Sequence, residues 1–246
     1  YRYNSGLVVG AGGGAPFVNT YSLEFDGIDD YVSLNSCIDL GINSTISLWV
    51  NFDAAYNGIL LGEDSYSFDY FLYPYSTGFF VRIASVFKLY TNVHTYLTAG
   101  SWHHLAVVRS GDSVEIYVDG ISRETQTGFG AAISTKFDTI AAKPDGVTLP
   151  LEGKIDEIAV WDNNTVSISD IYNGGNPTDL TDLSPIAWYR MGDNGSYKSP
   201  QWLLPNNENK DKVSNYSLDF DGVDDYIDCG DSDTFSFGNG TTDSPF

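Results

Sequence analysis

The sequence predicts an all-β protein in which antiparallel strands form a layered β-sandwich. Apolar and polar residues alternate in several short segments, which is the period of a half-buried strand. No segment shows the longer periodicity of an amphipathic helix. Turn dipeptides such as Asp119-Gly120 separate the segments, as in sheets built from successive hairpins. These observations favour strands that pair with their neighbours in the chain.

One dodecapeptide occurs twice and predicts the domain organisation. It reads YSLEFDGIDDYV at 21–32 and YSLDFDGVDDYI at 216–227, and nine of its twelve positions are identical. A spacing of 195 residues indicates tandem domains, because the units of solenoids have roughly 20–50 residues. We expect a linker or preceding strand at 1–20, a first domain at 21–183 and the start of a second, incomplete copy at 184–246.

The repeat itself predicts a strand, a tight turn and a second strand. Leu23 and Phe25 alternate with polar residues, and Asp26-Gly27 supplies turn chemistry. Three carboxylates, Asp26, Asp29 and Asp30, fall within five residues. Such crowding is relieved either by water or by a cation, and calcium prefers hard oxygen ligands. The turn is therefore a candidate calcium site or a solvated acidic turn.

The middle of the first domain predicts a central sheet. Residues 45–52 alternate strictly, with Ile46, Leu48, Val50 and Phe52 on one face. Residues 102–109 are apolar on both faces, as in a central strand, and two turns then make a three-stranded meander. His103 and His104 are adjacent, so they point to opposite faces and do not chelate one metal ion.

The end of the first domain is more varied. Residues 125–150 are rich in loop-forming residues, and residues 151–161 predict another strand. Residues 167–172 predict one short helical turn with a Ser cap. Residues 185–191 predict the strand that begins the second copy.

Composition excludes some classes of partner. The net charge is −21, with 33 acidic and 12 basic residues, and phosphate binding needs a basic patch. We therefore expect no nucleic acid or anionic membrane as a partner, whereas divalent cations are permitted. No apolar run approaches the roughly 18 residues of a membrane span, so we expect no membrane insertion. Cys37 and Cys229 fall in different copies, so no internal disulfide is expected.

Four blocks of sequence resemble a known family. They are FDGIDDYV, TISLWVNF, SWHHLAVVRSGDSVEIYVDG and GKIDEIAVWDNNTVSISDIYNGG, and together they span 21–175. They resemble the laminin G-like jelly rolls of the concanavalin A-like lectin/glucanase superfamily. The resemblance implies a jelly-roll sandwich and a module that binds glycans or proteins, outside the cell or on the surface of a cell or virion.

The resemblance also bears on catalysis and calcium. Glucanases of this fold resemble one another in a Glu-x-Asp-x-(x)-Glu strand motif, which sets two carboxylates at about 5–5.5 Å. Here Lys154 stands where the first Glu belongs, so we expect no enzymatic activity. Relatives tie their first and last strands together with calcium near two of the blocks. This implies a structural calcium held by Asp26 and Asp156, with Asp29 and Asp30 as lesser candidates.

Loops at the rims of the sheets are the expected ligand face, since jelly-roll strands are committed to the core. The aromatic-rich stretch 56–80 supplies rings for the core or for stacking on sugars. We expect glycans or cell-surface polysaccharide as partners. Copies of the chain or neighbouring subunits of a fibre or shell are the alternative partners. The candidate ligand residues are Tyr56, Tyr73, Tyr75, Tyr90, Asn57, Asn92 and Asp145.

Overall fold

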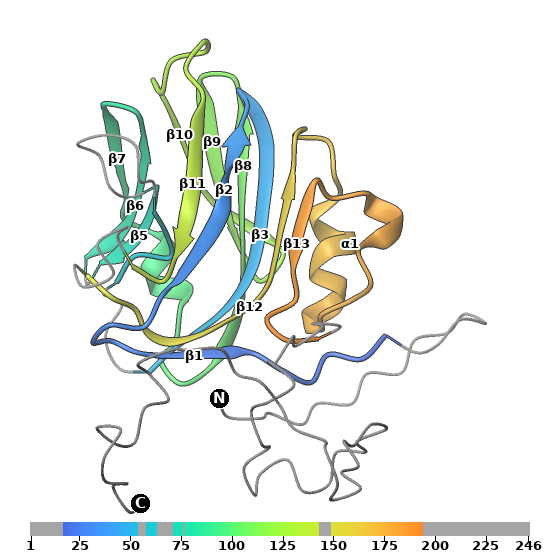
Figure 1. Cartoon of the computed structure of the whole chain (residues 1–246). Helices are drawn as coiled ribbons and strands as arrows, with labels where there is room; N and C mark the ends of the chain where they lie inside the picture. Colours follow the sequence, from blue (N-terminus) through green and yellow to red (C-terminus); the bar gives the residue numbers. More distant parts are fainter. Residues whose placement is uncertain (1–16, 54–57, 63–70, 76, 143–148, 194–246) are drawn as a thin grey trace, which may run out of the picture. The chain divides into compact units, whose positions relative to one another are not determined.

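Two antiparallel sheets form a β-sandwich, as the sequence predicts (Figure 1). The structure is a computed structural model of the 246-residue chain, and it describes residues 17–53, 58–62, 71–75, 77–142 and 149–193. Contacts within the chain divide it into two units, 1–196 and 197–246. All of the described residues belong to the first unit. The second copy of the dodecapeptide lies outside the described residues.

Within the described residues, sheet A has seven strands and sheet B has six. Sheet A has the order β1-β12-β3-β8-β9-β10, with β13 also paired to β12; sheet B has the order β2-β11-β4-β5-β6-β7. The strands of sheet A are β1 (Leu23–Asp26), β12 (Glu152–Trp161), β3 (Asn43–Phe52), β8 (Trp102–Ser110), β9 (Ser113–Val118), β10 (Ile121–Thr127) and β13 (Ala187–Tyr189). Those of sheet B are β2 (Val32–Leu40), β11 (Thr135–Ile140), β4 (Leu61–Gly62), β5 (Leu72–Tyr75), β6 (Gly78–Ile83) and β7 (Val86–Tyr90). The short helices are η1 (Val93–Tyr96), α1 (Ile168–Tyr172), η2 (Asn173–Gly175) and η3 (Thr181–Leu183).

The main core lies between the sheets, and the alternation within β3 confirms the predicted inner face. Ile46, Leu48, Val50 and Phe52 all belong to this core and are at most 1% exposed. Trp49, between them, points to the opposite face. There its ring stacks on Tyr172 of α1.

A second, smaller core lies on the outer face of sheet A, where α1 covers it (Figure 1). Trp161 of β12 packs there against Ile171 and Leu180. The predicted helical turn is confirmed, with Ser167 as N-cap accepting from the Asp170 amide. None of the helices among the described residues is long and apolar enough to cross a membrane.

Two features differ from the sequence-based expectation. Strand β11 lies within the stretch predicted to be loop-rich. It is hydrogen-bonded to β2 on one side and to β4 on the other. Strand β13, placed by the sequence at the start of the second copy, pairs with β12 of the first sheet. The domain boundary at residue 184 remains a prediction, but the strand that follows it belongs to the first unit.

Candidate functional site

The acidic turn links β1 of sheet A to β2 of sheet B. Asp26 Oδ1 accepts from the Ile28 amide at 2.8 Å, and Gly27 takes the positive φ of 75° that the turn requires. Asp26, Asp29 and Asp30 are exposed, and one carboxylate oxygen from each lies within 4.8 Å of the others. Calcium takes six to eight oxygen ligands. The three carboxylates fit part of such a shell, with water to complete it.

Asp156 does not reach this turn. In the β1–β12 ladder Asp26 lies opposite Glu152, four residues before Asp156. Four residues of strand span about 13 Å. The prediction that Asp26 and Asp156 hold the same ion is therefore wrong, because the register of the first and last strands separates them.

Asp156 and Glu157 occupy a bulge in β12. The ladder with β3 shifts register between Asp156 and Ala159, and Glu157 has a φ of 49°. The bulge allows Ile155 and Ile158, three residues apart, both to reach the core. It also leaves two consecutive acidic side chains buried, at 5% and 3% exposure.

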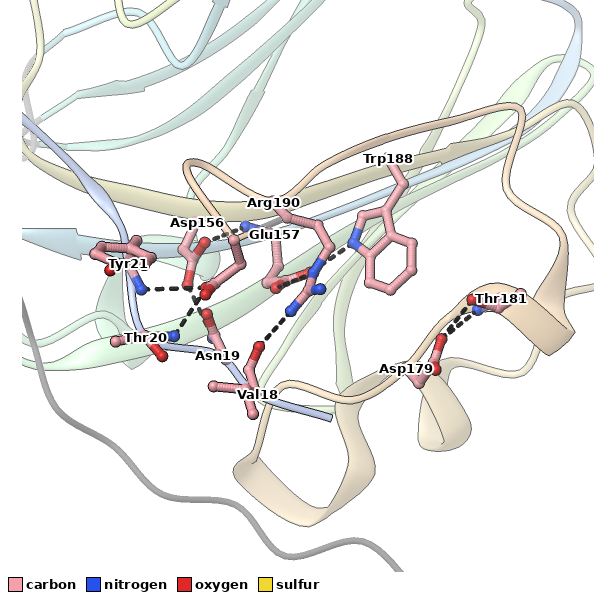
Figure 2. Close-up of polar contacts among 11 residues, drawn as sticks. Val18, Asn19, Thr20, Tyr21, Asp156, Glu157, Asp179, Thr181, Trp188 and Arg190 are labelled. Atoms are coloured by element: carbon pink, nitrogen blue, oxygen red, sulfur yellow. Dashed lines mark hydrogen bonds and ion pairs between the residues drawn. The ribbon is translucent and has the colours of Figure 1, made fainter. Parts of the chain in front are cut away.

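Glu157 is bound by two side chains that flank Tyr189 of β13 (Figure 2). Trp188 Nε1 donates to Glu157 Oε2 at 2.5 Å, and Arg190 Nε donates to Oε1 at 3.1 Å. The guanidinium of Arg190 also lies over the rings of Phe17 and Trp188, at 4.4 Å and 5.1 Å from their centroids. Arg190 is therefore fixed by an ion pair and by two aromatic faces.

The segment before β1, residues 17–21, crosses this region, and we call it the strap (Figure 2). Asn19 Nδ2 donates to Asp156 Oδ2 at 2.9 Å. The amides of Thr20 and Tyr21 donate to Asp193 Oδ2 at 2.8 Å and 3.1 Å. Arg190 donates to the carbonyl oxygen of Val18 at 2.6 Å. Residues from β12 and from the chain after β13 thus hold the strap in place.

The ionisable side chains around the bulge and the strap carry more negative than positive charge. Asp156, Glu157 and Asp193 are buried, and Arg190 is the cation that pairs with Glu157. Burial raises the pKa of Asp156 to about 8, and the charges of Glu157 and Asp193 act in the same direction. Burial also raises the pKa of Glu157, against the opposing effect of Arg190. The neutral form of Asp156 is therefore favoured near neutral pH.

Two arrangements bear on catalysis. Lys154, at the position where a glucanase has a carboxylate, lies 3.6 Å from Glu24 and 3.5 Å from Asp53. Ser47 Oγ lies 2.8 Å from His104 Nε2, the spacing of a nucleophile and its base. However, Ser47 and His104 are at most 1% exposed, and Trp49 and Tyr172 pack against the imidazole. This pair is buried beneath α1 and is not open to a substrate.

Four predicted ligand residues lie among the described ones. Tyr90 is fully buried and donates its hydroxyl to Val114 O at 2.9 Å, and Tyr73 is only 8% exposed. The prediction that these two rings form exposed stacking surfaces is wrong, because Tyr90 faces the core and Tyr73 packs on Phe80. Tyr75 is 42% exposed and Asn92 is exposed. Tyr56, Asn57 and Asp145 lie outside the described residues.

An aromatic row, which sequence reasoning missed, lies on the outer face of sheet B. In β6 Phe79 and Val81 face the core, so Phe80 between them faces outward. The Phe80 ring stacks on Phe87 of β7 with centroids 4.5 Å apart, and it contacts the rings of Tyr73 and Tyr75. Phe87 and Tyr75 are 46% and 42% exposed. We call these four residues the aromatic row: Tyr73, Tyr75, Phe80 and Phe87.

Comparisons with known proteins agree with the fold. The model of the concanavalin A-like lectin/glucanases superfamily of laminin G type matches residues 26–171. No curated protein matches the chain. Among solved structures, a "putative carbohydrate binding protein" from Bacteroides ovatus ATCC 8483 has 14% identity and a TM-score of 0.53, covering 72% of this chain and 53% of that chain.

Two further solved structures are similar to this chain. A heptameric SAP-like pentraxin from Limulus polyphemus has 17% identity and a TM-score of 0.49, covering 63% of this chain and 83% of that chain. Domains LG4-5 of the mouse laminin alpha1 chain have 18% identity and a TM-score of 0.42, covering 56% of this chain and 40% of that chain.

Proposed function

Since this chain belongs to the concanavalin A-like lectin/glucanases superfamily, in its laminin G-type branch, we propose that it is a non-catalytic, glycan-binding module of a repetitive adhesion protein. The observation that carries the proposal is the aromatic row on the outer face of sheet B. Phe87 and Tyr75 are close to half exposed there. Exposed aromatic rings that lie side by side in contact mark binding surfaces more often than scattered apolar residues do.

The chemistry of the row suits sugars. A pyranose has an apolar face that stacks on an aromatic ring and a rim of hydroxyls that need hydrogen-bond partners. Phe80 and Phe87 stack on each other at 17° with centroids 4.5 Å apart, and the ring of Tyr75 is tilted by 48° to Phe80. The exposed parts of Phe87 and Tyr75 on either side of Phe80 are therefore the apolar surfaces open to a sugar. The net charge of −21 repels polyanions. We therefore propose uncharged polysaccharides as the ligand class, outside the cell or on the surface of a cell or virion.

Replacing Tyr75 and Phe87 together by alanine should weaken glycan binding about tenfold or more, because two aromatic contacts contribute on the order of 1–3 kcal/mol. Both rings are half exposed, so the melting temperature should change little. The measurement is retention on an array of neutral polysaccharides, followed by titration with the best ligand. Tyr31→Ala is the matched control, because that ring is 45% exposed and lies outside the row.

Equal retention by the double variant and by wild type would remove the row as the glycan site. A second function, as a structural subunit that binds other protein copies, is favoured by the absence of hydroxyls on Phe80 and Phe87. In that case no glycan is retained. The double variant then lowers the mass of the assembly in solution.

We propose in addition that a calcium ion stabilises the acidic turn. The support is the approach of three carboxylates in one exposed turn, which repel one another without a cation. Excess calcium should raise the melting temperature, with a dissociation constant of about 0.1–1 mM, typical of extracellular calcium modules. Asp29→Asn combined with Asp30→Asn should abolish this increase, whereas Asp39→Asn, at an exposed site in β2, should retain it. A melting temperature that changes neither with excess calcium nor with a chelator would contradict the proposal.

A further inference from the structure

The edge of β12 between Glu157 and Trp161 carries a short strand that the sequence places elsewhere. Ile158, Ala159 and Val160 of β12 pair with Tyr189, Trp188 and Ala187 of β13. The Ile186 amide extends the ladder by donating to Val160 O at 2.8 Å. Strand β1 pairs with residues 152–155 of β12. The bulge at Asp156 and Glu157 therefore lies between the parts of β12 that receive β1 and β13.

Side chains make this pairing specific. Glu157 is 3% exposed and is bound at both oxygens, by the indole of Trp188 and the guanidinium of Arg190. Its backbone has a φ of 49°, which is uncommon for a residue with a β-carbon. A conformation of this kind persists only where its surroundings fix it. Here the Glu157 carboxylate is held between Trp188 of β13 and Arg190, the residue that follows β13.

The segment that contains β13 also binds the strap, at the N-terminal end of the described residues. Asp193 accepts hydrogen bonds from the amides of Thr20 and Tyr21, and Arg190 donates to Val18 O. The ring of Phe17 stacks on Trp188 with centroids 6.2 Å apart. The strap before β1 and the segment after β13, about 170 residues apart in sequence, therefore depend on each other.

We infer that residues 187–193 close the first module, and that the edge of β12 is a receptor for a segment of the form Trp-x-Arg-x-x-Asp, in which a short strand is followed by a turn. Trp188 and Arg190 of this segment bind Glu157, and Asp193 captures the strap. The segment that resembles the beginning of a second copy is thereby committed to the first. The first module therefore includes residues up to 193, and the strand that pairs with this edge of β12 comes from the same chain.

The full chain tests this inference through a protease recognition sequence inserted after Ser184, an exposed residue between η3 and β13. After cleavage without denaturant, the fragment that begins at Pro185 should co-elute with the rest of the chain. Combined Trp188→Ala and Arg190→Ala substitutions should speed its release about tenfold or more, as expected when a buried ion pair and an aromatic contact are lost. Ile186→Ala is the control, because that side chain is 51% exposed. Its backbone amide still donates a hydrogen bond to Val160 O of β12 in the variant.

Two further measurements keep the test decisive. If the double variant does not fold, hydrogen exchange of the intact wild type replaces it; slow exchange at the amides of Thr20, Tyr21 and Ile186 supports the inference, and fast exchange contradicts it. A labelled synthetic peptide of residues 185–193 should bind the cleaved protein after the fragment has been removed, and should not bind the intact chain. Fragments that separate from wild type and double variant at the same rate would overturn the inference. So would a wild-type chain that forms dimers linked by exchange of β13.

Discussion

Replacing Arg190 by alanine is expected to destabilise the first module by about 3–5 kcal/mol, the usual effect of removing one partner of a buried ion pair. Glu157 is 3% exposed and its side chain contacts Arg190 at 3.1 Å. Without the guanidinium, a carboxylate remains buried with the indole of Trp188 as its neutral donor. The loss of contacts with Phe17 and Val18 adds to the effect.

Equilibrium unfolding in urea measures this loss. Lys154→Ala is the matched control, since its contacts with Glu24 and Asp53 are longer and more exposed and such pairs contribute about 0–1 kcal/mol. Adding Glu157→Gln to Arg190→Ala should recover part of the stability, because it removes the unpaired charge. An Arg190 variant no less stable than the Lys154 variant would show that the ion pair does not stabilise the fold.

Much of the fold follows from local patterns. Strands β3 and β9 place apolar residues in the main core at the period of two, and tight turns bound the meander. Strand β8 is apolar on both faces, as expected of a central strand of a sheet that is covered on both sides. Strand β11 lacked such a signal. Its sequence TKFDTI is half polar, and its two neighbours in the sheet, not its own periodicity, determine its conformation.

The candidate sites were harder to predict. The alternation of apolar and polar residues is interrupted within residues 154–161, where Ile155 and Ile158 are three residues apart instead of two or four. This interruption is the local signal of the bulge. Which residues bind Asp156 and Glu157 depends on the strap and on β13, far away in sequence. Tyr73, Tyr75 and Phe80 lie close together in sequence, but the pairing of β5 with β6 is what brings their rings into contact. Alternation within GFFVRI did indicate that Phe80 faces outward.

The stability of the module should fall as pH rises toward 8, and Asp156→Asn should remove much of this dependence. Burial raises the pKa of Asp156 from 3.8 in the unfolded chain to about 8 in the folded one. The folded state therefore binds more protons between these values. A group with a raised folded-state pKa contributes stability that is present below the unfolded pKa and is lost as pH rises through the folded pKa. At pH 8 and above, the variant should be more stable than wild type.

His104 acts in the opposite direction over part of this range. Burial lowers its pKa from 6.5 to about 4, so its contribution to stability is present above 6.5 and is lost as pH falls. Below pH 6.5 the contributions of Asp156 and His104 to the pH dependence of stability partly cancel. Between pH 6.5 and 8 His104 contributes no change, so the dependence due to Asp156 is measured by itself. Urea unfolding at several pH values in that window should show a slope for wild type and a smaller slope for Asp156→Asn. Asp39→Asn, at an exposed position, should keep the wild-type slope. Parallel slopes for all three proteins would mean that Asp156 stays ionised in the folded state, with its charge balanced by the donors of Asn19 and Glu157 or by a bound cation.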